Sequence, residues 1–155
     1  MQISEFKDAV GKFPTGVCVI STYVNNKLWG FTANSFVSVS LSPPLISFCL
    51  DKSSGSLNAF KETVFFAINI LSSNQEEISK HFAHSSTDKF IGINYSLSQF
   101  QTPHIHDSIS FLECKKYEMI DGGDHIIFMG EVVSVQVDET KTPLLYYAKA
   151  YRDMK

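Results

Sequence analysis

Gly30-Phe-Thr-Ala-Asn-Ser-Phe-Val-Ser-Val-Ser-Leu-Ser-Pro-Pro44 is the stretch that decides the fold. From residue 32 to residue 40 the even positions carry small polar residues, Phe36 excepted, and the odd positions from Val37 carry apolar ones. Alternation with a period of two is typical of a half-buried β-strand. We expect its apolar side to join a core, and its small polar side to let a flat ligand approach the backbone. The Pro43-Pro44 pair should interrupt the strand, because proline has no backbone donor.

The segments on either side predict a mainly β protein with short flanking helices. Strands are expected at 16–24, 28–33, 35–41, 45–50, 64–71, 108–119 and 125–137. Helices are expected at 4–13 and 74–83, and a short helix is expected to end near residue 61. Asn25-Asn26 favours a hairpin turn, since Asn tolerates a positive φ, and a second tight turn is expected at 121–124. Residues 85–98 are expected to form a loop and 143–151 a final aromatic segment. Many strands joined by hairpin turns favour a closed or partly closed barrel over a parallel sheet.

Composition excludes several classes of protein. With 155 residues, the chain is expected to form a single domain over residues 1–155. A net charge of -3 argues against a nucleic-acid partner, and no apolar run approaches the length needed to cross a membrane. The odd number of widely spaced cysteines, Cys18, Cys49 and Cys114, predicts core thiols in a reducing cytoplasm. Arg152 is the only arginine, so an anionic ligand would be held by lysine, hydroxyls or backbone amides.

A set of short motifs covers nearly the whole chain. They are Phe13-Pro-Thr-Gly-Val17, Gly30 to Phe36, Ser38 to Pro44, Phe66 to Leu71, Gln75, His81-Phe-Ala83, Leu112-Glu-Cys114, Gly123-Asp-His125, Gly130-Glu-Val132 and Pro143 to Tyr147. No single motif is specific, but the ordered set resembles the flavin reductase-like family, which has the FMN-binding split β-barrel fold. The chain most resembles the reductase components of two-component flavin-dependent monooxygenases. The resemblance implies a homodimer that reduces FMN or FAD with NADH or NADPH, and a partner monooxygenase that uses the reduced flavin.

Three segments are candidate flavin contacts. Small donors beside backbone amides suit the hydrogen-bonding edge of a flavin ring, and a Ser cluster at a helix start suits a phosphate. Carried over from the family, the candidates are Thr32, Ala33, Asn34, Ser35, Ser38, Val39, Ser40 and Cys49, then Asp51, Lys52, Ser54 and Ser56, then Phe82, Ala83 and Lys89. Each segment also has an ordinary structural interpretation: a barrel strand with a polar outer face, a Ser-capped helix start, and a core phenylalanine.

Gly123-Asp124-His125 is the motif nearest to chemistry. In the family it lies near the flavin face on which the nicotinamide stacks. His125 is therefore the candidate catalytic residue, binding the nicotinamide amide or helping to protonate reduced flavin, and Asp124 would orient its imidazole. Tyr147 and Tyr151 are further candidate nicotinamide contacts, although such tyrosines often serve only in packing. Hydride transfer needs no acid or base, because proximity and stacking suffice.

Other functions remain open on the sequence. A flavoredoxin-type electron carrier would bind FMN and oxidise little NADH, and a non-catalytic flavin sensor would show no turnover. His81 with His84, and His104 with His106, are spaced as two metal ligands would be, but no cysteine or acidic partner has a matching spacing, so no metal site is expected. The sequence does not decide between FMN and FAD, between NADH and NADPH, or between flavin as a substrate and as a prosthetic group.

Overall fold

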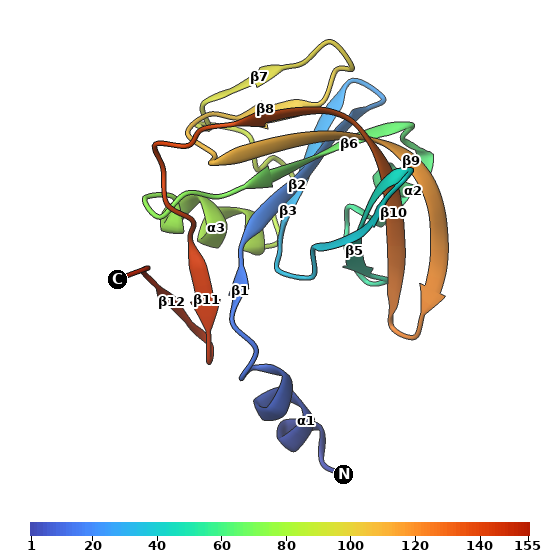
Figure 1. The fold of residues 1–155 in the computed structure, drawn as a ribbon. Coiled ribbons are helices and arrows are strands. Elements are labelled where there is room, and N and C mark those ends of the chain that lie inside the picture. The colour runs from blue at the N-terminus through green and yellow to red at the C-terminus, as the bar shows by residue number, and fades with distance from the viewer.

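A curled, antiparallel seven-stranded sheet forms the body of the molecule (Figure 1). The computed structural model describes residues 1–155. The sheet has the order β3-β2-β6-β9-β10-β5-β4. Its strands are β2 (Cys18–Val24), β3 (Lys27–Ala33), β4 (Val37–Leu41), β5 (Pro44–Asp51), β6 (Phe65–Ile70), β9 (Ser110–Gly122) and β10 (His125–Val137). Because β3 and β4 are edges that do not pair with each other, the barrel is split rather than closed. The predicted split β-barrel is confirmed.

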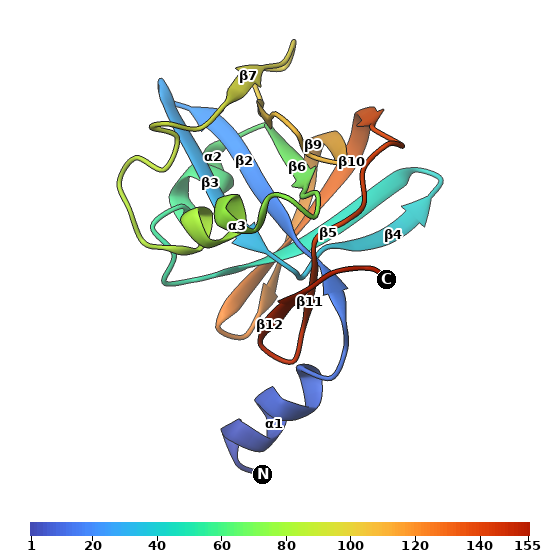
Figure 2. The ribbon, with the colours of Figure 1, turned by 90° about the vertical axis from the view of Figure 1, so that its left-hand side faces the viewer.

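Smaller elements surround this sheet (Figure 2). They are α1 (Ile3–Val10), α2 (Leu57–Glu62), α3 (Glu76–Ala83), the pair β7 (Tyr95–Leu97) and β8 (Pro103–Ile105), and a three-stranded sheet of β1 (Thr15–Gly16), β11 (Leu145–Tyr147) and β12 (Ala150–Arg152). None of the helices has the length and apolar character needed to cross a bilayer. Helix α1 projects from the barrel and has no buried residue, so its predicted apolar face, Phe6 and Val10, is exposed.

Phenylalanines fill the inside of the curled sheet. Phe48 of β5 stacks on Phe128 of β10 with 5.2 Å between ring centroids, and it meets Phe66 of β6 edge-on at 5.1 Å. Both arrangements are favoured by the quadrupoles of aromatic rings. Gly130 lies against this cluster, since a Cβ there would come within 2.4 Å of the Phe66 ring. The rings therefore fill the space that a side chain at position 130 would need.

A second cluster covers the outer face of the sheet where β2 and β3 pass beneath α3. It consists of Val17, Val19, Leu71, Phe82, Phe90, Ile105 and Leu144. Gly30 of β3 allows this packing, because a Cβ there would lie 2.9 Å from the ring of Phe82. This packing fixes the end of α3 over the free edge of β3.

The stretch that decided the fold contains the end of one strand and the whole of the next, as expected from the segments at 28–33 and 35–41. Strand β3 ends at Ala33 and β4 begins at Val37, so the alternation that runs through residues 32–40 crosses a break. The apolar residues of β4, Val37, Val39 and Leu41, are exposed rather than part of a core, and that expectation was wrong. Periodicity shows which side chains share a face, but not which face is covered.

Two hairpins were missed. Strands β7 and β8 have three residues each, within and just after the predicted loop at 85–98, which is too short for a periodic signal. The aromatic segment at 143–151 forms the hairpin β11–β12, whose turn residues Ala148 and Lys149 both have positive φ. Asn25 and Asn26 make the same kind of turn with φ of 53° and 59°, as predicted.

Candidate functional site

A cavity of about 490 Å³ lies along the free edge of β3. Three segments that are distant in sequence form its walls: residues 28–32 of β3, the end of β5 at Asp51 with residues 53–56 after it, and the end of α3 with residues from the loop at 84–89. Seven of the predicted flavin contacts line it: Thr32, Asp51, Ser54, Ser56, Phe82, Ala83 and Lys89. The fold therefore brings one part of each predicted segment to a single place.

Hydroxyl groups dominate two walls of this cavity, which we call the hydroxyl cavity. Ser53, Ser54, Ser56, Ser85, Ser86 and Thr87 all line it. Asp51 accepts hydrogen bonds of 2.7 Å from the amide and the hydroxyl of Ser53, and these bonds hold the pKa of that carboxyl below its usual value. Helix α2 has only six residues and the side chain of its first flanking residue, Ser56, makes no capping bond. The groups suited to an anion here are therefore the hydroxyls and a lysine.

Lys89 is the lysine that lines the hydroxyl cavity. Its Nζ donates to the Phe82 carbonyl at 3.0 Å, and the His81 ring nitrogen Nε2 lies 2.6 Å from the Lys89 carbonyl oxygen. These contacts tie the 84–89 loop to the end of α3. Partial burial lowers the pKa of the Lys89 ammonium. Lys52, the other predicted lysine, is directed away from the cavity and forms an ion pair with Asp121 in the β9–β10 hairpin.

A smaller cavity of about 210 Å³ adjoins the hydroxyl cavity, and the two share Thr32 and Ala83. Predicted residues Ala33, Asn34 and Tyr151 line it together with Val17, Ser79 and Tyr146. Ser79 joins three elements here, because its Oγ lies 2.7 Å from the Tyr151 hydroxyl and its carbonyl accepts from Thr32 Oγ1 at 2.6 Å. Helix α3 thereby links the C-terminal hairpin to β3.

A third hollow, a cleft of about 470 Å³, continues past Asn34. Residues 13–18 form one side and residues 34–37 the other, with Ile70 between them. Predicted contact Ser35 lines it, and the Ser35 hydroxyl accepts the amide hydrogen of Cys49 at 2.9 Å. This cleft is mostly apolar, as sites for planar rings usually are.

The predicted catalytic motif lies on the β9–β10 hairpin. Gly123 takes a φ of +77° at the turn, and the Nδ1 of His125 lies 2.7 Å from a carboxylate oxygen of Asp124. His125 is paired with Asp51 across β5 and β10. None of residues 123–125 lines the hydroxyl cavity, so Asp51 is the residue that connects the motif to it.

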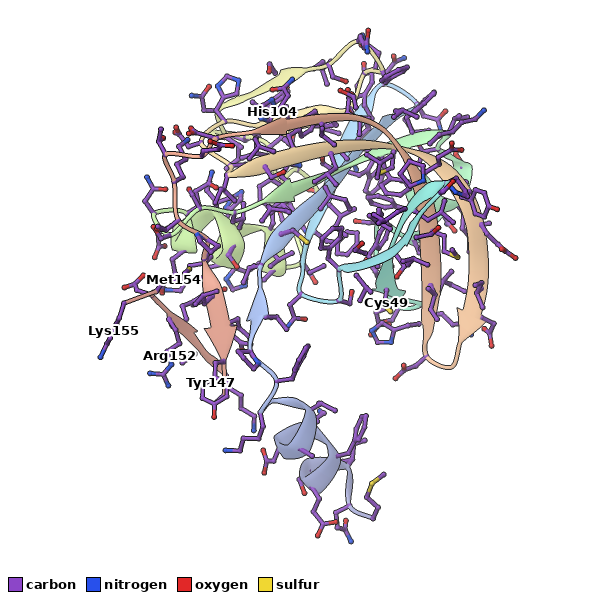
Figure 3. The ribbon with its side chains drawn as sticks, in the orientation of Figure 1. Cys49, His104, Tyr147, Arg152, Met154 and Lys155 are labelled. Carbon is purple, nitrogen blue, oxygen red and sulfur yellow. The ribbon has the colours of Figure 1, made fainter.

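Several predicted residues lie outside these hollows. Ser38, Val39 and Ser40 are on the edge strand β4, and Cys49 is partly buried on β5. Tyr147 lies at the β11–β12 turn (Figure 3), where it lines a groove beside α1 that shares Phe13, Thr15 and Asn34 with the cleft of about 470 Å³. All of these assignments remain predictions.

Sequence reasoning gave no role to several residues that line the hollows, and four of them carry side chains of interest here. They are Trp29, Ser79, Tyr146 and Thr15. Thr15 stood within the motif at 13–17, which was a usable signal, whereas nothing in the local sequence marks Ser79.

The histidines are dispersed over the structure rather than gathered with other potential metal ligands. No group of three or more His, Cys, Asp or Glu side chains is arranged to hold a metal ion. His104 stacks on Phe111 with 4.1 Å between ring centroids, and burial, followed by the nearby His106, lowers the pKa of its imidazole.

Comparison with known proteins gives a consistent result. The model of the flavin reductase-like domain matches residues 10–155. A flavin reductase of Pseudomonas putida is 36% identical over 147 residues, covering 94% of this chain and 86% of the relative. The HsaB reductase subunit of a flavin-dependent monooxygenase from Mycobacterium tuberculosis is 36% identical over 148 residues, covering 94% and 79%. The structure of the Streptomyces globisporus NADH:FAD oxidoreductase SgcE6 with NAD and FAD fragments matches with a TM-score of 0.95 at 33% identity, covering 99% of this chain and 93% of that one.

Proposed function

This chain belongs to the flavin reductase-like family, and we propose that the hollows along β3 are its flavin site. The protein is an NAD(P)H:flavin oxidoreductase that supplies reduced flavin to a partner monooxygenase. The observation that carries the site is the meeting of three distant segments around the free edge of β3. An unpaired strand edge presents backbone donors and acceptors, which suit the hydrogen-bonding edge of a flavin.

The groups present fit a flavin at both of its ends. The hydroxyl cavity offers Lys89 and a wall of serines to a phosphate, and the apolar cleft beyond Asn34 suits a planar ring. A bound flavin would supply the acceptor, at its N5, for a hydride from C4 of a reduced nicotinamide. The protein's contribution is to hold the two rings in contact and to exclude water from between them.

His125 is proposed as the catalytic residue of the nicotinamide side. Its Nδ1 is held by Asp124, which leaves Nε2 to face a ligand. The Lys52 amide donates to the Asp124 carbonyl at 2.9 Å, so the turn is tied to the segment that lines the hydroxyl cavity. An imidazole placed this way can bind the nicotinamide amide or deliver a proton to the reduced flavin. Gly123, Tyr147 and Tyr151 are proposed as its neighbours in nicotinamide binding.

NADH is the proposed nicotinamide. The only arginine, Arg152, lies on β12 and lines none of the three hollows, so no guanidinium is offered there to a 2′-phosphate. A relative from Streptomyces globisporus, 34% identical over 153 residues, is an NADH-dependent FAD reductase. This similarity supports NADH as donor.

A homodimer is also proposed, in a reducing cytoplasm. Val37, Val39 and Leu41 on the free edge β4, and Val133 and Val135 on β10, are large apolar side chains exposed on two strands of the same sheet. Apolar surface of this extent marks an interaction site. The three free cysteines suit a reducing compartment. Sedimentation at several protein concentrations would test the dimer, and a monomer at all of them would contradict it.

The first experiment measures NADH oxidation in air with FMN or FAD, and repeats it with NADPH. We expect oxidation that scales with added flavin and is faster with NADH. Bound flavin without oxidation would instead favour the electron carrier or sensor.

A further inference from the structure

Thr15 has an unusual hydroxyl. Its Oγ1 is the one buried side-chain polar atom in the protein without a hydrogen-bond partner. A buried hydroxyl that makes no hydrogen bond costs about 1–3 kcal/mol, and such groups in native proteins call for an explanation. Other buried hydroxyls of this protein are satisfied: Ser21 donates to the Pro103 carbonyl and Thr22 to that of Phe65. The cost at Thr15 therefore points to a role outside the unliganded fold.

Thr15 lies at the apolar cleft of about 470 Å³. Together with Asn34 and Ser35, it supplies the polar side chains of a lining that otherwise consists of Phe13, Pro14, Gly16, Val17, Cys18, Phe36, Val37 and Ile70. Strand β1 holds it in place, because Thr15 pairs with Tyr146 of β11. The hydroxyl is thus on a fixed strand, directly opposite the segment expected to contact the flavin.

The three hollows follow one another from β3 to the segment at 34–37 that comes after it. The hydroxyl cavity and the small cavity share Thr32 and Ala83, and the small cavity and the apolar cleft share Val17 and Asn34. A ligand with a phosphate near Lys89 at one end would therefore place a planar ring near Thr15 at the other. This order matches a flavin, which carries its ring and its phosphate at opposite ends of a ribityl chain.

The Thr15 hydroxyl is free to change its position by rotation about χ1. The residue as a whole is only partly buried although Oγ1 is covered. Rotation of χ1 by about 120° moves the threonine hydroxyl into the position that the methyl group or the Cβ hydrogen held. The hydroxyl has no hydrogen bond to lose in that rotation, so a ligand acceptor or donor in the cleft favours it.

We propose that Thr15 is a flavin-binding residue whose hydroxyl hydrogen-bonds to the edge of the isoalloxazine ring in the apolar cleft. This inference rests on the proposed function only in taking flavin as the ligand. It places the ring between residues 13–18 and residues 34–37. It also gives the motif Phe13-Pro-Thr-Gly-Val17 a chemical role.

The test replaces Thr15 by valine, which keeps the shape and removes the hydroxyl. Riboflavin is the probe, because it has the ring but no phosphate, and its binding is measured by fluorescence titration. We expect Thr15→Val to raise the Kd about two- to tenfold, the worth of one neutral hydrogen bond. We expect the melting temperature of the unliganded protein to stay the same or rise, since an unsatisfied hydroxyl is removed. Thr15→Ser should bind riboflavin within about twofold of the wild type.

Thr22→Val is the matched control. It is the same substitution at a buried threonine whose hydroxyl is bonded, at 2.8 Å, to the Phe65 carbonyl. This variant should lower the melting temperature and leave the riboflavin Kd unchanged, the reverse of Thr15→Val.

Three results would overturn the inference. The first is wild-type riboflavin affinity in Thr15→Val. The second is a melting temperature of Thr15→Val that falls as far as that of Thr22→Val. The third is a Thr15→Val variant with an unchanged flavin Kd and a raised KM for NADH. A wild-type protein that binds riboflavin but does not oxidise NADH would refute the proposed function and leave this inference standing.

Discussion

Replacing Lys89 by methionine removes the positive charge of the lysine in the hydroxyl cavity while keeping most of the length of the side chain. In the structure the Lys89 Nζ donates one of its hydrogens to the Phe82 carbonyl at 3.0 Å. Two hydrogens remain for a ligand, and an ammonium bonded to a phosphate forms a charge-assisted bond. We therefore expect Lys89→Met to weaken the binding of flavins that carry a phosphate.

The size of the effect follows from the exposure of Lys89. Hydrogen bonds to charged groups are worth about 1.5–3 kcal/mol, and the side chain is only partly buried, so solvent screening places Lys89 at the low end of that range. About 1.5 kcal/mol corresponds to a Kd for FMN that is about tenfold higher. The variant also leaves the Phe82 carbonyl, in the last turn of α3, without its partner. A small loss of stability is expected with it.

The assay compares FMN with riboflavin by fluorescence titration of the wild type, Lys89→Met and Lys89→Arg. We expect FMN affinity to fall in Lys89→Met and to survive largely in Lys89→Arg, and riboflavin affinity to be equal in all three. An equal loss for riboflavin would mean that the substitution distorts the cavity. Unchanged FMN affinity would place the phosphate elsewhere and refute the proposed orientation of the flavin.

The pH dependence has a definite sign. Burial lowers the pKa of Lys89 below the usual lysine value of 10.5, and only the protonated amine attracts a phosphate. The preference for FMN over riboflavin should therefore be lost as the pH rises through this lowered pKa, below the range in which an ordinary lysine titrates. In Lys89→Met the two ligands should show no such divergence at alkaline pH.

Four further results are expected. His125→Ala should slow NADH-dependent flavin reduction with nearly unchanged flavin affinity, and unchanged turnover would remove His125 from the mechanism. Asn34→Trp should weaken flavin binding by filling the junction of two hollows; wild-type affinity would show that no flavin passes there. Gly130→Ala should cost about 1–3 kcal/mol of unfolding free energy by overpacking, read from denaturant titration, and full stability would contradict the packing described. Burial raises the thiol pKa of Cys18 and of Cys114 to about 12, so both should resist alkylation at pH 8 until the protein is unfolded, and rapid reaction in the native state would refute their burial.

The turns show how much of the fold the sequence determines locally. Asn25-Asn26 was predicted as a hairpin turn because Asn accepts a positive φ, and the structure has that turn. Ala148 and Lys149 adopt similar angles, with φ of 50° and 64°, yet neither residue type favours them. Contacts with α1 support the second turn: the Ala148 amide donates to the Gly11 carbonyl and Lys149 forms an ion pair with Asp8. Tertiary contacts thus favour a conformation that no local pattern could indicate.

In the candidate site, too, the sequence identifies some features locally, whereas others depend on long-range contacts. The segments that hold Thr32, Asp51 and Lys89 were recognised from the sequence, because short motifs mark where small, acidic or basic side chains recur. Their meeting along one free strand edge depends on the order of the sheet, which is a long-range property. Ser79 has no motif at all, since its importance lies in the two partners that it joins, Thr32 and Tyr151.

The two free edges of the sheet explain why one alternating stretch carries two different roles. Both β3 and β4 end the seven-stranded sheet, and the stretch at 30–44 contains the end of β3 and all of β4. Beside β3 the backbone edge is walled by hydroxyls and by Lys89, so a polar ligand can complete it. On β4 the alternate residues Val37, Val39 and Leu41 are exposed and apolar, so a protein surface suits it better. Because residues 34–36 join the two strands, a subunit docked on β4 would lie next to the cleft that contains Thr15. In the proposed homodimer, dimer formation and flavin binding should therefore be coupled, and a substitution such as Val39→Asp that weakens this dimer should also raise the Kd for riboflavin.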